Sequence, residues 1–206
     1  MAIIDDPTAF FQTTLYTGDG GGTRAVTNDG NSDLSPNWVW IKDRGTTSTH
    51  YIFDSVRGVQ KHLTSAATTQ ELTDANSLKS FNSDGFTLGT SGNVNGNSRS
   101  FVSWNWKAGT SFTNDASATG IGSIDSTGSV NQEAGFSIIS YTGIGGTNQS
   151  VAHGLGATPK FIIIKARSAS GYWPVTNPRF VSVSDPNMLY LNLSNGGEAD
   201  DTNING

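Results

Sequence analysis

An internal repeat constrains the fold of this 206-residue chain more than any other feature. Residues 15–18 and 38–44 read Leu-Tyr-Thr-Gly and Trp-Val-Trp-Ile-Lys-Asp-Arg. They return in the same order at 140–143 and 161–167, as Ser-Tyr-Thr-Gly and Phe-Ile-Ile-Ile-Lys-Ala-Arg. The offset is 125 residues at the first motif and 123 at the second, so a two-residue deletion relates the copies. Two units of related structure are therefore expected.

The second copy is the shorter one. Weaker matches pair residues 62–64 with 190–192 and 71–74 with 198–201, and they leave the segment 80–108 without a counterpart. That segment contains two stretches whose apolar and polar residues alternate as in half-buried strands. A sandwich without its closing strands leaves edges and an apolar face in water. We therefore expect the chain to continue past Gly206; a strand from a neighbouring chain and a divergent half-domain packed on something else are the alternatives.

Hydrophobic periodicity predicts an all-β fold of antiparallel, jelly-roll-like β-sandwich modules in tandem, the second incomplete. Strands are expected at 11–17, 37–42, 50–54, 60–64, 85–89, 99–107, 135–142, 150–153, 160–166, 172–175, 179–183 and 188–193. Residues 73–81 suggest one short helix capped by Thr73 or Asp74. The predicted domains are a first module over 1–108, a Gly/Ser/Thr/Asp-rich linker over 109–133 and a truncated second module over 134–206.

Composition excludes several classes of protein. The chain has 25 Gly, no Cys, only 14% charged residues and a net charge of −5. The absence of Cys removes disulfides and thiol catalysis, and an acidic chain without a basic cluster argues against a nucleic-acid partner. No apolar run approaches the roughly 18 residues that cross a bilayer, so we expect no membrane insertion.

No motif indicates catalysis, and we assign no catalytic, cofactor-binding or metal-binding residue. His50, His62 and His153 lack metal-ligand spacing. Residues 29–33 resemble the start of a calcium loop without its later ligands, so a turn is favoured and a bound cation stays open. A glycoside hydrolase needs two converging carboxylates. The available acids sit mainly in turn sequences, where they hydrogen-bond the backbone; they are Asp5, Asp6, Asp54, Asp74, Asp84, Asp125 and Glu133.

Two tryptophan pairs, Trp38 with Trp40 and Trp104 with Trp106, have the i, i+2 spacing that puts both side chains on one face of a strand. The favoured interpretation is that they fill the sandwich core. The alternative is a platform on which sugar rings stack, and it has more weight for Trp104 and Trp106.

Five strings together resemble a known family. They are Phe-Phe-Gln-Thr-x-Leu-Tyr-Thr-Gly, Trp-Val-Trp-Ile-Lys-Asp-Arg, Phe-Asp-Ser-Val-Arg-Gly, Phe-Asn-Ser-Asp-Gly-Phe-Thr-Leu-Gly and Val-Ser-Trp-Asn-Trp-Lys-Ala-Gly, at residues 10–18, 38–44, 53–58, 81–89 and 102–109. This combination is similar to the repeated β-domains of tail-fibre-like virion proteins of marine, notably cyanobacterial, bacteriophages. The resemblance covers nearly the whole chain. It implies a β-rich structural module of a phage particle and transfers no catalytic residue.

The resemblance implies a non-enzymatic tail fibre or tail appendage that is assembled in the host cytoplasm and serves host adsorption. Its expected protein partners are other virion proteins, of the tail or of an adaptor. The protein is also expected to bind copies of itself, as a trimer by analogy with fibres, and to bind a host-surface glycan. The segment 1–12 is a candidate for docking on the particle through Ile3, Ile4, Phe10 and Phe11; the alternative is that these residues form the first strand. A capsid decoration or head-fibre protein, and a polysaccharide-binding or depolymerising tail protein, are the other functions considered.

Overall fold

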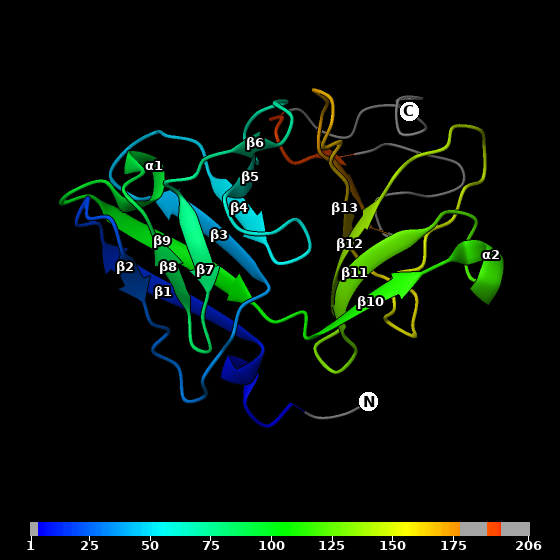
Figure 1. Ribbon diagram of the computed structural model, residues 1–206, viewed down its shortest axis with the longest axis horizontal. Coiled ribbons are helices and arrows are strands. Elements are labelled where there is room, and N and C mark those ends of the chain that lie inside the picture. Colours follow the sequence, from blue (N-terminus) through cyan, green and yellow to red (C-terminus); the bar gives the residue numbers. More distant parts are fainter. Residues whose placement is uncertain (1–3, 178–188, 195–206) are drawn as a thin grey trace.

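The computed structural model describes residues 4–177 and 189–194, and its first half contains two antiparallel sheets that share a core (Figure 1). The larger sheet has the strand order β1 (Phe11–Thr17), β9 (Ser100–Trp106), β3 (Trp38–Asp43), β4 (Tyr51–Asp54), β5 (Lys61–Thr64) and β6 (Leu72–Thr73). The smaller sheet has the order β2 (Arg24–Val26), β8 (Phe86–Leu88) and β7 (Leu78–Phe81). The predicted all-β, antiparallel fold is confirmed.

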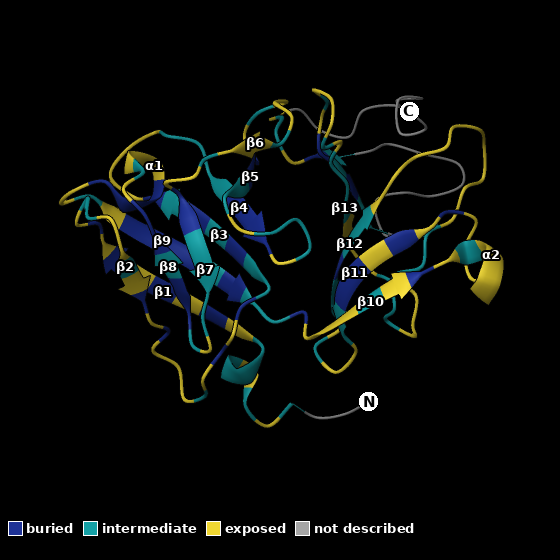
Figure 2. Ribbon diagram, in the orientation of Figure 1, coloured by how far each residue is buried: buried dark blue, intermediate teal, exposed yellow. Residues whose placement is uncertain are grey.

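Alternation along the strands decides what enters this core. In β3, Val39 and Ile41 point toward the smaller sheet, where they join Phe86 and Leu88 in one cluster of fully buried side chains. Burying an apolar side chain of this size stabilises the fold by about 1.5–3 kcal/mol relative to leaving it exposed. Figure 2 shows the buried residues gathered along these sheets, with exposed residues on loops and at alternate positions of the edge strand β1.

The second half of the chain forms two further three-stranded antiparallel sheets. One has the order β10 (Thr110–Asn114), β11 (Ser126–Asn131) and β12 (Phe136–Tyr141). The other has the order β13 (Ile162–Ile163), β14 (Pro174–Thr176) and β15 (Leu189–Tyr190). Two predicted strands differ here: residue 151 makes only an isolated bridge with Ile124, and 179–183 lies outside the described residues.

The prediction of a linker over 109–133 is wrong. These residues form β10, the short helix α2 (Ala116–Thr119) and β11, which pair with each other and with β12. The segment has few large apolar residues, but its Thr and Val residues favour strands, and β12 supplies much of the apolar surface against which it packs. Counting hydrophobic residues alone therefore missed it.

The prediction of a helix over 73–81 is also wrong. The Asp74 carboxylate accepts a hydrogen bond from the Asn76 N–H (2.8 Å), and the Ser77 N–H donates to the Asp74 carbonyl oxygen (3.1 Å). This turn sends the chain into β7, so the side chain expected to cap a helix closes a turn. The described helices are short: η1 (Pro7–Ala9), α1 (Gly92–Asn95) and α2.

The sequence repeat is matched by strand register. Val39 pairs with Phe53 and Trp40 with Ile52 in the first half, and Ile162 pairs with Thr176 and Ile163 with Val175 in the second. Each of these four residues in the second half lies 123 residues after its counterpart in the first half. The predicted match of 62–64 with 190–192 is two residues out of step, because the strand pairing aligns Leu63 and Thr64 with Leu189 and Tyr190. A two-residue slip keeps every side chain on its face, so the pattern could not reveal it.

The two halves are packed against each other. The Trp173 indole is 2% exposed, and its Nε1–H donates to the carbonyl oxygens of Thr64 and Ala67, each at 3.1 Å. It packs against the buried side chains of Ile52 and Leu63 in the larger sheet. The second half therefore covers part of the face of that sheet that points away from the smaller sheet.

Candidate functional site

The outer face of the larger sheet, which points away from the smaller sheet, carries the four paired tryptophans. Strand register places Phe11, Trp106 and Trp38 in one cross-strand row, and Thr13, Trp104 and Trp40 in the next. Residues opposite each other in adjacent strands lie on the same face. The prediction that the two tryptophan pairs fill the sandwich core is therefore wrong, because β3 gives Val39 and Ile41, and β9 gives Phe101, to that core. Trp38 and Trp40 pack instead on a second hydrophobic cluster, on the outer face of the larger sheet.

The second half covers one of these rows. The Phe136 ring lies 6.3 Å from the Trp38 ring, edge to face, and 6.1 Å from the Trp106 ring, stacked. Trp38 and Trp106 are thus contacts between the halves. Phe136, Trp173 and Arg167 were not singled out from the sequence; the only signal was that Arg167 ends the repeated motif.

Trp40, His50 and Trp104 form a half-buried group on this face, which we call the aromatic surface. The Trp40 and Trp104 rings meet edge to face at 6.3 Å, and the His50 ring stacks on Trp104 at 6.3 Å with an interplanar angle of 7°. The Trp40 Nε1–H donates to His50 Nδ1 at 2.9 Å. These contacts fix the orientation of all three rings.

Burial, and secondarily the positive charge of Lys42, lower the pKa of His50 below its ordinary value of 6.5. The ring is therefore neutral at pH 7, and because Nδ1 accepts from Trp40, its proton sits on Nε2. The aromatic surface thus combines flat apolar rings with one N–H donor.

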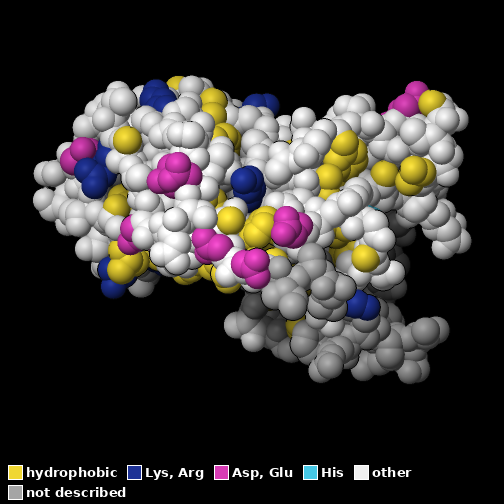
Figure 3. Space-filling view, turned by 90° about the horizontal axis from the view of Figure 1, so that it is seen from below, with side chains coloured by type: hydrophobic (Ala, Val, Ile, Leu, Met, Phe, Trp, Pro, Cys, Tyr) yellow, Lys and Arg dark blue, Asp and Glu magenta, His cyan; other side chains and the backbone are white. Residues whose placement is uncertain are grey.

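The edge strand β1 extends the aromatic surface with exposed apolar side chains. Phe11 is 37% exposed and Leu15 is 60% exposed, while Thr13 between them is also exposed. Figure 3 shows that, on the face it presents, hydrophobic side chains occur in small groups among polar ones. Aromatic rings beside hydroxyl and N–H groups suit a ligand with apolar faces and hydroxyl edges, such as a sugar.

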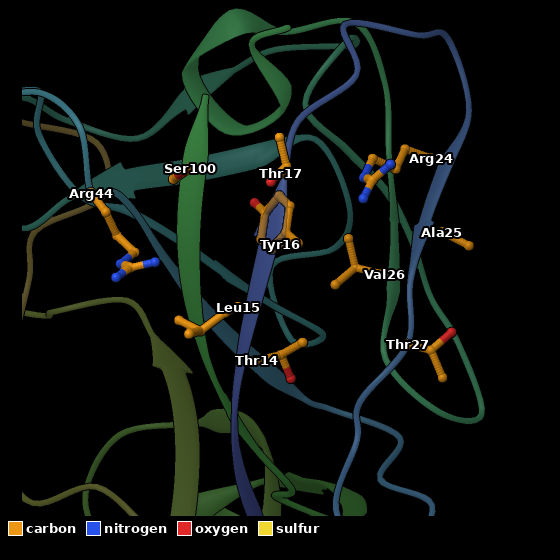
Figure 4. Close-up of a pocket in the computed structure, with 10 residues that line it drawn as sticks. All are labelled: Thr14, Leu15, Tyr16, Thr17, Arg24, Ala25, Val26, Thr27, Arg44 and Ser100. Atoms are coloured by element: carbon orange, nitrogen blue, oxygen red, sulfur yellow. The ribbon is translucent and has the colours of Figure 1, made fainter. Parts of the chain in front are cut away.

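Apart from the aromatic surface, a hollow lies between the edge strands β1 and β2 (Figure 4). Two of its polar side chains are engaged: the Tyr16 hydroxyl donates to the Val94 carbonyl oxygen (2.8 Å), and Arg24 Nη1 pairs with Asp19 (3.3 Å). Arg24 Nε is buried without a hydrogen-bond partner among the described residues. Burial raises the pKa of Tyr16, so this hydroxyl stays protonated.

Two carboxylates, those of Asp54 and Glu71, share Arg57 as a partner where the halves meet. Asp54 forms an ion pair with Arg57, and Glu71 accepts from both Arg57 (3.3 Å) and Arg167 (3.0 Å). Burial alone would raise the pKa of Glu71, but the hydrogen bonds and charges of the two arginines outweigh it and lower that pKa. A general acid needs a raised pKa, so this cluster has the character of a structural ion pair.

The remaining predicted residues are spread over the structure. Ile3 lies outside the described residues, Ile4 is half-buried, Phe10 follows η1 and Phe11 begins β1, so the docking role of this segment stays a prediction. His62 lies on β5 and His153 in a loop. Within the described ranges, no three His, Asp or Glu side chains gather as metal ligands do, and no helix is long and apolar enough to span a membrane.

Fold and site together define an all-β sandwich protein whose larger sheet bears an outward-facing aromatic surface. The chain belongs to the DUF7483 family, described as a domain of unknown function, whose profile matches residues 6–206. No curated protein and no solved structure matches the chain.

Proposed function

We propose that this protein is a structural, non-enzymatic component of a bacteriophage particle, a tail fibre or tail appendage that serves host adsorption. The proposal depends on the position in the fold of the five segments that resemble tail-fibre-like proteins. These segments lie in β1, in β3, in β4 and its following turn, in the β7–β8 hairpin and in β9. The segments therefore fall on four adjacent strands of the larger sheet and on the β7–β8 hairpin, and leave β2, β5 and β6 outside them. A shared scaffold, more than a shared catalytic site, explains such strings.

The contact between the halves supports a mechanical role. Trp173, Phe136 and Arg167 reach from the second half into the first through packing, hydrogen bonds and an ion pair. Sandwich units fixed in this way form a stiff arm, whereas units on a flexible linker would move independently. A stiff arm suits an appendage that holds a binding surface away from a particle.

We further propose that the aromatic surface contacts host-surface glycans. The Trp40 and Trp104 rings offer apolar faces, and the neutral His50 offers an N–H donor. Single contacts of this kind are weak, but several copies on one particle raise the overall avidity by orders of magnitude. In this proposal the segment 1–12 docks on other virion proteins, and the protein assembles as a homo-oligomer, a trimer by analogy with fibres.

Immunogold electron microscopy of purified particles, with antibodies raised against this protein, tests the location. Label on the tail is the expected result. Label over the shell would replace the tail assignment with a capsid decoration or head fibre. Particles without label, with the protein also absent from their mass spectra, would overturn the virion assignment.

Binding to purified surface polysaccharide of the host tests the aromatic surface. Trp104→Ala is expected to weaken binding at least tenfold, because it removes a stacking face and the partner of His50. Tyr172→Ala is the matched control, since Tyr172 is an aromatic residue 45% exposed in the second half. Equal effects of the two variants would contradict this role, and release of reducing sugar would instead indicate a depolymerase.

A further inference from the structure

The second half of the chain contains a pair of strands whose counterparts in the first half have a third strand between them. In the first half, β9 lies between β1 and β3 and is hydrogen-bonded antiparallel to both. By the repeat, β12 corresponds to β1 and β13 to β3. Among the described residues, β12 pairs with β11 alone and β13 with β14 alone. No described strand is therefore hydrogen-bonded to β12 and β13 at the position that β9 occupies in the first half.

The repeated residues are less covered in the second half than in the first. Tyr16 in β1 is 8% exposed, whereas its counterpart Tyr141 in β12 is 41% exposed. Val39 in β3 is fully buried, whereas its counterpart Ile162 in β13 is 40% exposed. Equivalent side chains are thus buried in the first half and exposed in the second. In the first half these side chains are covered by the smaller sheet, through Phe86 and Leu88, and by Phe101 of β9.

We propose that β12 and β13 form an acceptor site for a β-strand donated by another polypeptide chain. The donated strand is an extended segment of about seven residues with the alternating pattern of β9, and it runs antiparallel to both acceptor strands. Its main-chain groups pair with the free edges of β12 and β13, which supplies affinity, and its side chains supply specificity. This inference does not depend on the virion assignment.

The first half indicates what the donated strand must carry. Phe101 of β9 pairs with Tyr16, and the two rings stack at 5.2 Å with an interplanar angle of 14°. A donor is therefore expected to place an aromatic ring on Tyr141. Arg167, which follows β13 in the chain, contacts β12 at this end, since its Nη1–H donates to Ser140 Oγ at 2.7 Å.

A second copy of this chain is a poorer occupant than a free segment. The position needs a strand whose two edges are both unpaired, because it must bond to β12 on one side and β13 on the other. The exposed edge strand β1 already uses one edge for β9. β9 itself is paired on both sides within its own sheet.

The test uses a fluorescent peptide with the sequence of residues 98–108, Ser-Arg-Ser-Phe-Val-Ser-Trp-Asn-Trp-Lys-Ala, titrated with the full chain. We expect saturable binding at one peptide per chain. A peptide with proline in place of the residue corresponding to Ser103 is expected to lose binding, because proline removes a main-chain donor and disrupts the ladder. Hydrogen–deuterium exchange should slow at residues 136–141 and 162–163 when the peptide binds.

Two substitutions in the chain make the test specific. Ile162→Asp is expected to weaken peptide binding at least tenfold, and Leu72→Asp, at an apolar position 44% exposed on β6, is the matched control. Tyr141→Ser removes a ring without adding charge and should also weaken binding if Ile162→Asp fails to fold. No saturable binding, protection at residues 11–17 in place of β12 and β13, or equal loss in the Leu72→Asp control would overturn the proposal. Self-association of the chain without peptide binding would also overturn it.

Discussion

Glu71 and Arg167 are joined by a two-pronged ion pair across the boundary between the halves. The Arg167 Nε–H donates to Glu71 Oε2 at 3.0 Å and its Nη2–H to Oε1 at 3.1 Å. The main chains join too, since the Glu71 N–H donates to the Arg167 carbonyl oxygen at 3.0 Å. Because Glu71 also binds Arg57 of its own half, one carboxylate links a corner of the first sandwich to the second half.

Glu71→Gln should destabilise the protein by about 1–3 kcal/mol, because the Arg57 side chain is 4% exposed and loses one of its two carboxylate partners. Arg167→Gln should cost less, about 0–1 kcal/mol, since Arg167 is 37% exposed and solvent screens its charge. Urea denaturation of both variants measures the difference. If Arg167→Gln lowers the free energy of unfolding as much as Glu71→Gln does, the ion pair of Glu71 with the buried Arg57 is not the more stabilising of the two.

Trp173→Phe should lower the free energy of unfolding by about 1–3 kcal/mol. The phenyl ring keeps most of the packing but leaves the buried carbonyl oxygen of Thr64 and that of Ala67 without the indole N–H. Tyr172→Phe is the neighbouring control and should change stability little. If the two variants unfold at the same temperature in calorimetry, the indole hydrogen bonds do not hold the halves together.

Gly85→Ala should destabilise the sandwich more than Gly58→Ala. Both glycines have a positive φ, +96° and +89°, so either substitution strains the backbone, by about 1–2 kcal/mol. At Gly85 an added Cβ would also lie 2.0 Å from the Val26 carbonyl oxygen, whereas at Gly58 it would meet nothing within 4 Å. The difference in melting temperature between the two variants measures the destabilisation caused by the steric clash at Gly85. Equal melting temperatures would show that β2 and β8 move apart without a cost in stability.

Acidification below pH 6.5 should reduce stability through His50 and His62. Burial is the main cause that lowers the pKa of both His50 and His62 below the ordinary 6.5. As pH falls, these two histidines therefore bind protons in the unfolded chain before they do so in the folded protein. The free energy of unfolding accordingly decreases from pH 6.5 down to the pKa values of the folded state. The lowered pKa of Glu71 acts in a separate window, below 4.5.

The free energy of unfolding, measured by urea titration between pH 7.5 and pH 5, checks this. His50→Gln with His62→Gln should flatten the curve in that range. An unchanged slope in this double variant would assign the pH dependence to other groups.

The strands of the first sandwich could be predicted because their signal is local. In β1 and β3, every second residue turns to the core, and that alternation can be read without knowing what packs there. The short β2, β6 and β7 were missed because few residues carry their pattern. Asp74 was misassigned because the same residue type closes turns and caps helices.

The aromatic surface was only half predictable. The i, i+2 spacing correctly placed Trp38 with Trp40 on one face, but both faces of β3 are rich in apolar side chains. Which face meets the smaller sheet depends on where β7 and β8 fold back, a contact between residues far apart in the sequence. The pairing of Trp40 with His50 likewise follows from the path of the loop between β3 and β4.

The sequence by itself determined an all-β chain of antiparallel strands and a repeat offset of 123 residues at β3. These properties follow from local periodicity and from comparison of the chain with itself. Only the tertiary structure decided that the tryptophans face outward, that 110–131 forms a hairpin on β12, and that Glu71 and Trp173 join the halves. Each of these depends on the energy of long-range packing, which no local pattern encodes.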